Sequence, residues 1–202
     1  RIDSLAGVGA GAGVAGVGAA VSVNQIDGYV TANVGSGTDD TVLAGITGLD
    51  IAATDNSVVN SLAVGGAGAG IAGGAGSSTA NSVRTSTLAR LQNASMTGQD
   101  ADVRVAAFDT RQIQSHAGSG AGGGAAGVGM AVSVNEIDGS TAAVVDGQSQ
   151  ALSGLAGLAV EAVSHASIQS IAIGAAGGGL AAAGGSNTTN LIGSDTLASV
   201  DD

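Results

Sequence analysis

The sequence contains no cysteine, proline, tryptophan or lysine, and it has one tyrosine and one phenylalanine among 202 residues. Without cysteine there is no disulfide framework, and cysteine usage says nothing about the redox compartment. So few aromatic side chains leave almost nothing on which bases or sugar rings could stack. The five basic residues are arginines against sixteen acids, which gives a net charge of −11. This charge disfavours nucleic acid and anionic membrane surfaces as partners.

Glycine is abundant, with 37 residues, and 44% of the residues are hydrophobic. Collagen is excluded because the glycines follow no Gly-X-Y period. A disordered linker is disfavoured because valine, isoleucine and leucine recur in register, whereas disordered chains are poor in these residues. The Gly/Ala tracts are too weakly hydrophobic for a membrane helix, so we expect no membrane insertion.

A repeat runs through the whole chain. Each unit begins with a large aliphatic residue that is followed two positions later by a serine. A Gly/Ala tract comes next, and an asparagine follows this tract. The serines are Ser4, Ser61, Ser115 and Ser170, and the asparagines are Asn24, Asn81, Asn135 and Asn190. Both sets are 57, 54 and 55 residues apart. Two independent markers with one spacing indicate a single repeat array, with units 2–58, 59–112, 113–167 and a partial 168–202. We interpret the chain as an excised piece of a longer array.

The residues after each asparagine form matching columns. The second position is aliphatic and the eighth is alanine, and the sixth and tenth hold valine, threonine or leucine. Steps of two place the later positions on one face of a strand. The second-position residues are Ile26, Val83, Ile137 and Ile192, and the eighth-position residues are Ala32, Ala89, Ala143 and Ala198. We expect the array to be held together by these columns and by the asparagine ladder.

Further strands and turns are expected between the columns. The segments 49–53, 103–107 and 158–162 alternate apolar with polar or small residues, as a half-buried strand does. Turn chemistry is expected at 35–40 and 146–149, and at the Asp27-Gly28 and Asp138-Gly139 pairs.

The Gly/Ala tracts are expected to be strands. As helices they would lose about 1 kcal/mol per glycine relative to alanine. Glycine weakens strands too, unless another backbone approaches closely. We therefore predict an all-β fold, a flattened, Gly/Ala-rich parallel β-helix (β-solenoid) with a repeat unit of about 55 residues. Whether one unit makes one coil or two stays open.

The pattern resembles the repeats of large bacterial filamentous adhesins, of the leukotoxin type and the filamentous-haemagglutinin type. The resemblance rests on Asn60-Ser61-Leu62-Ala63, on the Val-Ser-Val-Asn exit that ends at Asn24, and on the segments 41–45 and 49–51. It covers essentially the whole chain, although units 2 and 4 depart from the Val-Ser-Val-Asn exit. It implies a parallel β-helix, secretion to the outer surface of a Gram-negative bacterium, and a stalk or adhesive role without a catalytic motif.

The polar residues allow several interpretations. The asparagine ladder could bind a ligand, but stacked asparagines at a turn of a β-helix are a structural device. Calcium could bind at Asp39-Asp40, at the two Asp-Gly pairs or at Asp100 and Asp102, yet none matches a calcium motif. We therefore expect no cofactor, with Ca²⁺ as the open alternative. His116 aligns with Leu5, Leu62 and Ile171, which predicts a half-buried column.

Three functions follow. The first is a structural segment of a secreted adhesin, acting as a rigid stalk or contact surface. The second is a self-assembling subunit of an extracellular filament. The third and weakest is a polysaccharide-acting β-helix enzyme using Asp102, Arg104, Asp109 and Arg111, so we expect no enzyme. A threonine column at the sixth position after the asparagine also raises the hypothesis of an ice-binding face. The expected partners are neighbouring repeats or copies of the chain, with a host or cell-surface receptor or glycan as an open alternative.

Overall fold

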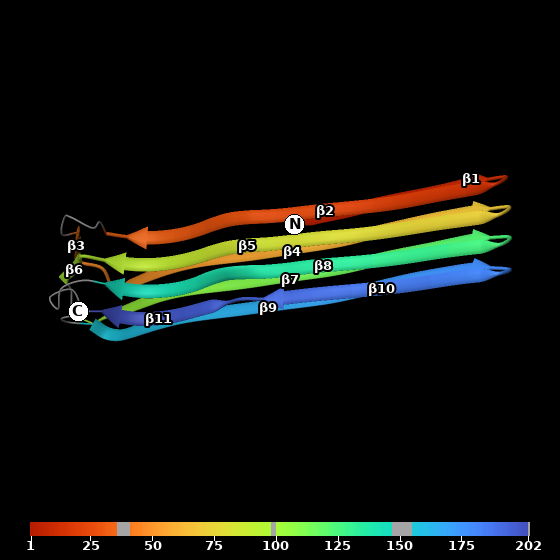
Figure 1. The fold of residues 1–202 in the computed structure, drawn as a ribbon. Helices are drawn as coiled ribbons and strands as arrows, with labels where there is room; N and C mark the ends of the chain where they lie inside the picture. Colours follow the sequence, from red (N-terminus) through yellow and green to blue (C-terminus); the bar gives the residue numbers. More distant parts are fainter. Residues whose placement is uncertain (36–40, 98–99, 147–154, 202) are drawn as a thin grey trace.

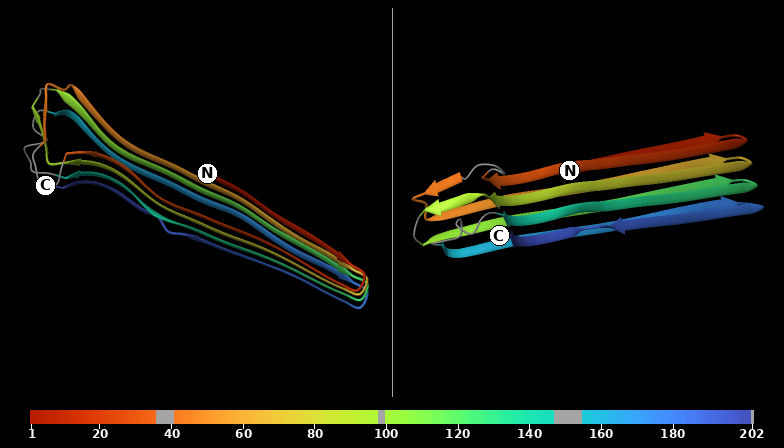
Figure 2. Two further views of the ribbon diagram at one scale, coloured as in Figure 1. Left: turned by 90° about the horizontal axis from the view of Figure 1, so that it is seen from above. Right: turned by 60° about the vertical axis from the view of Figure 1, so that its left-hand side comes forward.

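The computed structural model describes residues 1–35, 41–97, 100–146 and 155–201. All secondary-structure elements in these ranges are β-strands. Figure 1 shows these strands running side by side, with tight turns at one end, and Figure 2 shows that the layers are narrower at this end than at the other. Sheet 1 contains β1 (Ile2–Ala12), β4 (Gly48–Ala69), β7 (Ala101–Gly123) and β9 (Leu155–Gly178). Sheet 2 contains β2 (Ala15–Val34), β5 (Ala72–Gln92), β8 (Ala126–Asp146), β10 (Ala181–Ile192) and β11 (Asp195–Asp201). A small third sheet pairs β3 (Thr41–Ala44) with β6 (Ala94–Thr97).

Every strand pairs in parallel with the equivalent strand of the next unit. In sheet 1, Ile2 pairs with Val59, Val59 with Ile113 and Ile113 with Ile168. These pairings reproduce the 57, 54 and 55-residue spacings of the sequence, with one register shift at Ala101/Asp102. The predicted all-β class with stacked parallel strands is confirmed. Each full unit contributes one long strand to sheet 2 and two strand segments to sheet 1, because the boundaries between units fall inside β4, β7 and β9.

The strands are longer than the sequence indicated. The Gly/Ala tract, the asparagine and the apolar columns form one strand in β2, and likewise in β5 and β8. The predicted turns at Asp27-Gly28 and Asp138-Gly139 are wrong, because both pairs lie inside strands. A side chain on Gly139 would collide with the guanidinium of Arg111 and the carbonyl of Thr85. Gly139 therefore provides space for a buried arginine. The segments 36–40 and 147–149 of the expected turns lie outside the described residues.

The two long sheets face each other with a core that changes along the strands. Figure 2 shows the layers close together at the narrow end and further apart at the wide end. Near the wide end an aliphatic cluster includes Ile51, Leu91, Val103, Val105 and Val145. A second cluster, closer to the middle, contains Val59, Val83, Ile113 and Ile137. Side-chain size thus sets the separation of the sheets.

At the narrow end the sheets pack backbone to backbone. A Cβ placed on Gly16 would lie 2.9 Å from the carbonyl oxygen of Gly68. On Gly18 or Gly65 a Cβ would lie still closer, well under 3.0 Å, to the carbonyl oxygen of Gly66 or Gly76. Real Cβ atoms essentially never come so near, so only glycine fits. The expected close approach of a second backbone to the Gly/Ala strands is confirmed.

Charge divides the molecule in the same way as thickness. We call the segments 4–24, 61–81, 115–135 and 170–190 the blade, and the other described residues the base. The blade contains no aspartate, glutamate, lysine or arginine, and His116 is its one histidine. All sixteen acids and all five arginines lie outside it. The blade is therefore a thin, uncharged plate attached to a thicker, acidic base.

Candidate functional site

The four asparagines form a hydrogen-bonded row on the inner face of sheet 2. The side-chain amide of Asn24 donates to Oδ1 of Asn81 at 2.8 Å, and Asn81 donates to Asn135 at 2.8 Å. Asn135 donates in turn to Asn190 at 2.9 Å. The sequence analysis expected this row at a turn. The row lies in mid-strand instead, because the strand continues through the Asp-Gly pair.

Hydroxyl groups extend the row across to sheet 1. The Asn81 amide also donates to Ser115 Oγ at 3.1 Å. Ser115 in turn lies 2.7 Å from the hydroxyl of Thr79 and 2.9 Å from that of Ser133. All these side chains are buried. The network links neighbouring units and both sheets, and it uses amide and hydroxyl groups with no activated nucleophile among them. Its chemistry suits fixing the register.

The apolar columns lie in register on the inner face of sheet 2. Ile26 pairs with Val83, and Val83 with Ile137, which pairs with Ile192. The alanine column pairs in the same way through Ala32, Ala89, Ala143 and Ala198. The neighbouring threonine column also points inward, with Thr87 and Thr141 buried. This burial rules out that column as an ice-binding face.

A buried ion pair lies between the two aliphatic clusters. Arg111 Nε is 2.8 Å from Asp109 Oδ2, and neither side chain has any exposed surface. The guanidinium also donates to Ser164 at 2.8 Å and to Ser194 at 3.1 Å, and Thr141 donates to Asp109 at 3.3 Å. Burial raises the pKa of the Asp109 carboxyl, which Arg111 lowers in part and Asp55 raises further. Asp109 Oδ1 and the Nε and Nη1 of Arg111 have no hydrogen-bond partner, so Asp109 and Arg111 are joined by charge without a hydrogen bond between them.

The four residues of the enzyme hypothesis do not come together. Asp109 and Arg111 point into the core, whereas Asp102 and Arg104 alternate onto the outer face. Arg104 pairs there with Asp50 at 3.4 Å and with Glu161 at 3.3 Å. In the register of sheet 1, Arg104 lies beside Asp50 on β4 and Ala159 on β9. The sequence missed the buried pair, although the two-residue step from Arg111 to the inward Ile113 could have revealed it.

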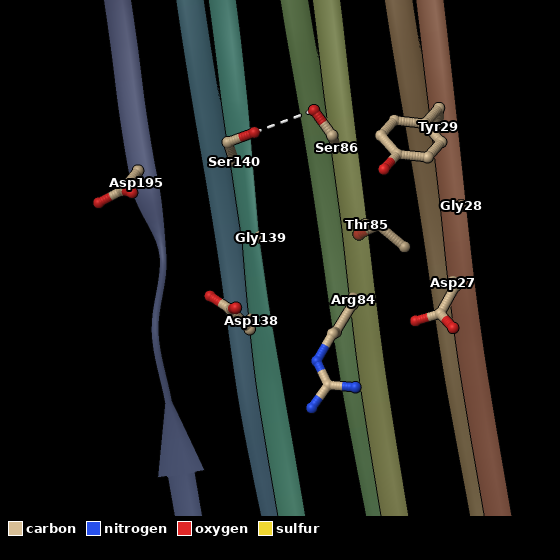
Figure 3. A pocket seen from close by; sticks show the side chains of 10 residues that line it. All are labelled: Asp27, Gly28, Tyr29, Arg84, Thr85, Ser86, Asp138, Gly139, Ser140 and Asp195. Carbon is tan, nitrogen blue, oxygen red and sulfur yellow. Dashed lines mark hydrogen bonds between the residues drawn. The ribbon is translucent and has the colours of Figure 1, made fainter.

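An open acidic depression crosses the outer face of sheet 2 in the base (Figure 3). Asp27, Arg84 and Asp138 occupy one column on adjacent strands, and Asp195 lies nearby on β11. Arg84 bonds to Glu136 at 2.6 Å. Tyr29, 88% exposed, points its hydroxyl toward the neighbouring strand. The depression offers carboxylates and a phenol for hydrogen bonding from the solvent side, but no enclosed cavity.

The cation candidates remain separate. Within the described ranges, no group of three or more histidine, cysteine, aspartate or glutamate side chains could hold a metal ion. Asp27 and Asp138 lie on either side of Arg84, and the pair Asp39-Asp40 is outside the described residues. Asp100 has a positive φ of 63° just before β7, which starts at Ala101.

The predicted half-buried column of His116 is wrong. His116 is exposed, and Leu5, Leu62 and Ile171, which share its column, are 77%, 39% and 51% exposed. The inward residues at this level are the serines, because strand side chains alternate between faces. Large apolar side chains therefore lie on the outer surface of the blade.

No family model, curated protein or solved structure matches this chain. Among the described residues there is also no helix of the length and hydrophobicity needed to cross a bilayer.

Proposed function

We propose that this chain is a segment of a flattened β-solenoid in a secreted filamentous adhesin at the outer surface of a bacterium. Each unit of about 55 residues would form one coil. The observation that carries the proposal is the continuous register between units in sheet 2, with the same ladder of inner hydrogen bonds repeated at each step. Such an array lengthens by adding units, and the adhesin-like motifs of the sequence supply the functional assignment.

The dimensions favour a contact surface over a simple spacer. One unit adds about 4.8 Å along the stacking axis, because that is the distance between paired strands. A strand of 22 residues such as β4 is about 70 Å long. An array of these units is therefore a wide ribbon that gains little length per residue. Most residues of such an array therefore enlarge its broad outer faces, which suits a contact surface.

Small-angle scattering and electron microscopy of the chain and of its tandem duplicate test this proposal. Four stacked units are expected to measure about 19 Å along the axis, and duplication should double that thickness while the width of about 70 Å stays constant. A compact globule, or growth along the strand direction, would contradict the coil assignment. Antibodies against the chain should label intact cells of the producing bacterium; labelling only after lysis would contradict the surface location.

A self-assembling filament subunit is the second candidate, favoured by the strand edges that the described residues present at the two sides of the stack. In the described residues β1 and β2 form one edge of the two sheets, and β9 and β10 form the other. Unpaired strand edges add further strands readily. Long fibres that grow with protein concentration and keep a width of about 70 Å would support this candidate. Particles of constant length at every concentration would contradict it.

A further inference from the structure

The outer face of the blade in sheet 2 has a regular relief. Units 1 and 3 place mostly large apolar side chains outward, and units 2 and 4 place glycine, alanine or polar side chains at the same positions. The ridges are Val17, Val21 and Val23 on β2, and Val128, Met130 and Val134 on β8. These six side chains are between 44% and 78% exposed. Between the ridges β5 contributes Gly74 and Gly76, and beyond β8 the strand β10 contributes Gly185. Ridge and groove therefore alternate from strand to strand.

From this relief we infer that the blade is a docking surface for a second copy of the same chain, packed face to face through sheet 2. This inference rests on the proposed stacked-coil fold. A ridge of one copy fits the groove of another when the two are shifted by one strand. The inner faces of the same tracts already show that glycine-rich strands can pack backbone to backbone, as at Gly18 and Gly66.

The charge distribution permits this contact. A net charge of −11 opposes association between copies. Because the blade contains no acid, two blades that overlap with their bases at opposite ends bring no acidic residues of the blade into the contact. Salt should strengthen the association by screening the remaining repulsion between bases.

The available area grows with the length of the array. After a shift by one strand, ten residues of three strands overlap and cover about 33 Å by 14 Å. Face-to-face contact would therefore bury about 950 Å² in total, and one further unit brings it to the lower limit of about 1,200 Å² for a standard specific interface. Flat sheets of several strands are also typically stabilised by stacking. Longer arrays would enlarge the contact in proportion.

A lipid surface fits the blade less well. Side chains that anchor proteins at a bilayer interface are tryptophan, tyrosine, lysine and arginine. The blade contains none of them, since Tyr29 and all five arginines lie in the base. Its outer face also carries Asn187 and Thr189 on β10, in the same strand as Gly185. The observations thus favour a protein face of the same composition.

Sedimentation velocity across a concentration series tests the inference with two matched double variants. Val21→Glu with Val23→Glu places two charges on the blade face of β2, and Tyr29→Glu with Thr31→Glu places two on the base of the same strand. We expect the parent chain to self-associate, and the blade variant to weaken association at least tenfold. The base variant should stay within threefold of the parent. Circular dichroism and scattering of the monomer confirm that both variants keep the fold.

Cysteine cross-linking identifies the surface directly, because the chain has no cysteine of its own. Val21→Cys should give disulfide-linked dimers on mild oxidation, and Thr31→Cys should not. A chain that stays monomeric overturns the inference, as do equal losses in both double variants or end-to-end fibres without Val21→Cys dimers. A monomer that binds phosphatidylcholine vesicles through the blade also overturns it. A monomer of the expected coil dimensions would contradict only the docking surface and not the proposed fold. A compact globule would contradict both the docking surface and the proposed fold.

Discussion

The blade and the base use the same strands but are stabilised differently. In the base, aliphatic side chains such as Val105 and Ile137 are fully buried between the sheets, and each contributes about 1.5–3 kcal/mol. In the blade, glycine faces backbone and little apolar area is buried. Its order depends on ladder hydrogen bonds and on the Asn/Ser network. Tight packing without a hydrophobic core is therefore possible where identical neighbours satisfy the backbone.

A charge forced into the base should have the largest effect. Ala143 is fully buried, so Ala143→Arg leaves a guanidinium without a partner and should cost about 5 kcal/mol. Ala142, the next residue, alternates onto the outer face, and Ala142→Arg should cost less than about 1 kcal/mol. Chemical denaturation of both variants measures the difference. Equal stabilities would contradict the strand register.

The buried pair marks the border between the two aliphatic clusters of the base. Asp109→Asn leaves the Arg111 guanidinium charged in the core and should cost about 3 kcal/mol. The double variant Asp109→Asn with Arg111→Gln removes both charges and should recover most of that loss. Urea unfolding of the three proteins gives the comparison. If the double variant is the least stable of the three, the pair is a net stabilising contact and this account of it fails.

Glycine should be essential on only one face of the blade. Gly65→Ala places a methyl group against the carbonyl of Gly76 and should cost roughly 2 kcal/mol. Gly76→Ala meets no atom within 4 Å, and it should leave stability unchanged or raise it by a few tenths of a kcal/mol. Thermal unfolding of both variants checks the prediction. A neutral Gly65→Ala would mean that the sheets are further apart than described.

The smallest expected effect is a pH dependence confined to the base. Because the pKa of Asp109 is raised in the folded protein, the folded state holds this proton more tightly than the unfolded state does. Its contribution is fully present below the ordinary value of 3.8 and is lost as pH rises through the raised pKa. The free energy of unfolding of the parent minus that of the Asp109→Asn, Arg111→Gln double variant should therefore fall as the pH rises through that window. A flat or rising difference between pH 3 and 7 would contradict it.

The sequence predicted the pairing of the units better than the orientation of individual side chains. The serine and asparagine spacings gave the unit-to-unit pairing, because both markers shift together whenever a unit changes length. The orientation of His116 was missed because a run of glycine and alanine has no hydrophobic alternation from which to read a face. The Asp-Gly pairs were assigned to turns from local propensity, which the strand pairing of both with β5 overrides; at Gly139 the packing of Arg111 adds a further constraint. The burial of Asp109 and Arg111 was missed because such residues are rarely inside.

The central claim is that the two sheets of the blade face each other at close range with this register. It is tested most directly by Ser115→Cys with Ser133→Cys, since the two hydroxyl oxygens lie 2.9 Å apart across the sheets. The account predicts that this pair forms an intramolecular disulfide under mild oxidation. His116→Cys with Ser133→Cys should form none, because His116 points to the opposite face of its strand. A disulfide in the His116 variant, or none in the Ser115 variant, would contradict the account.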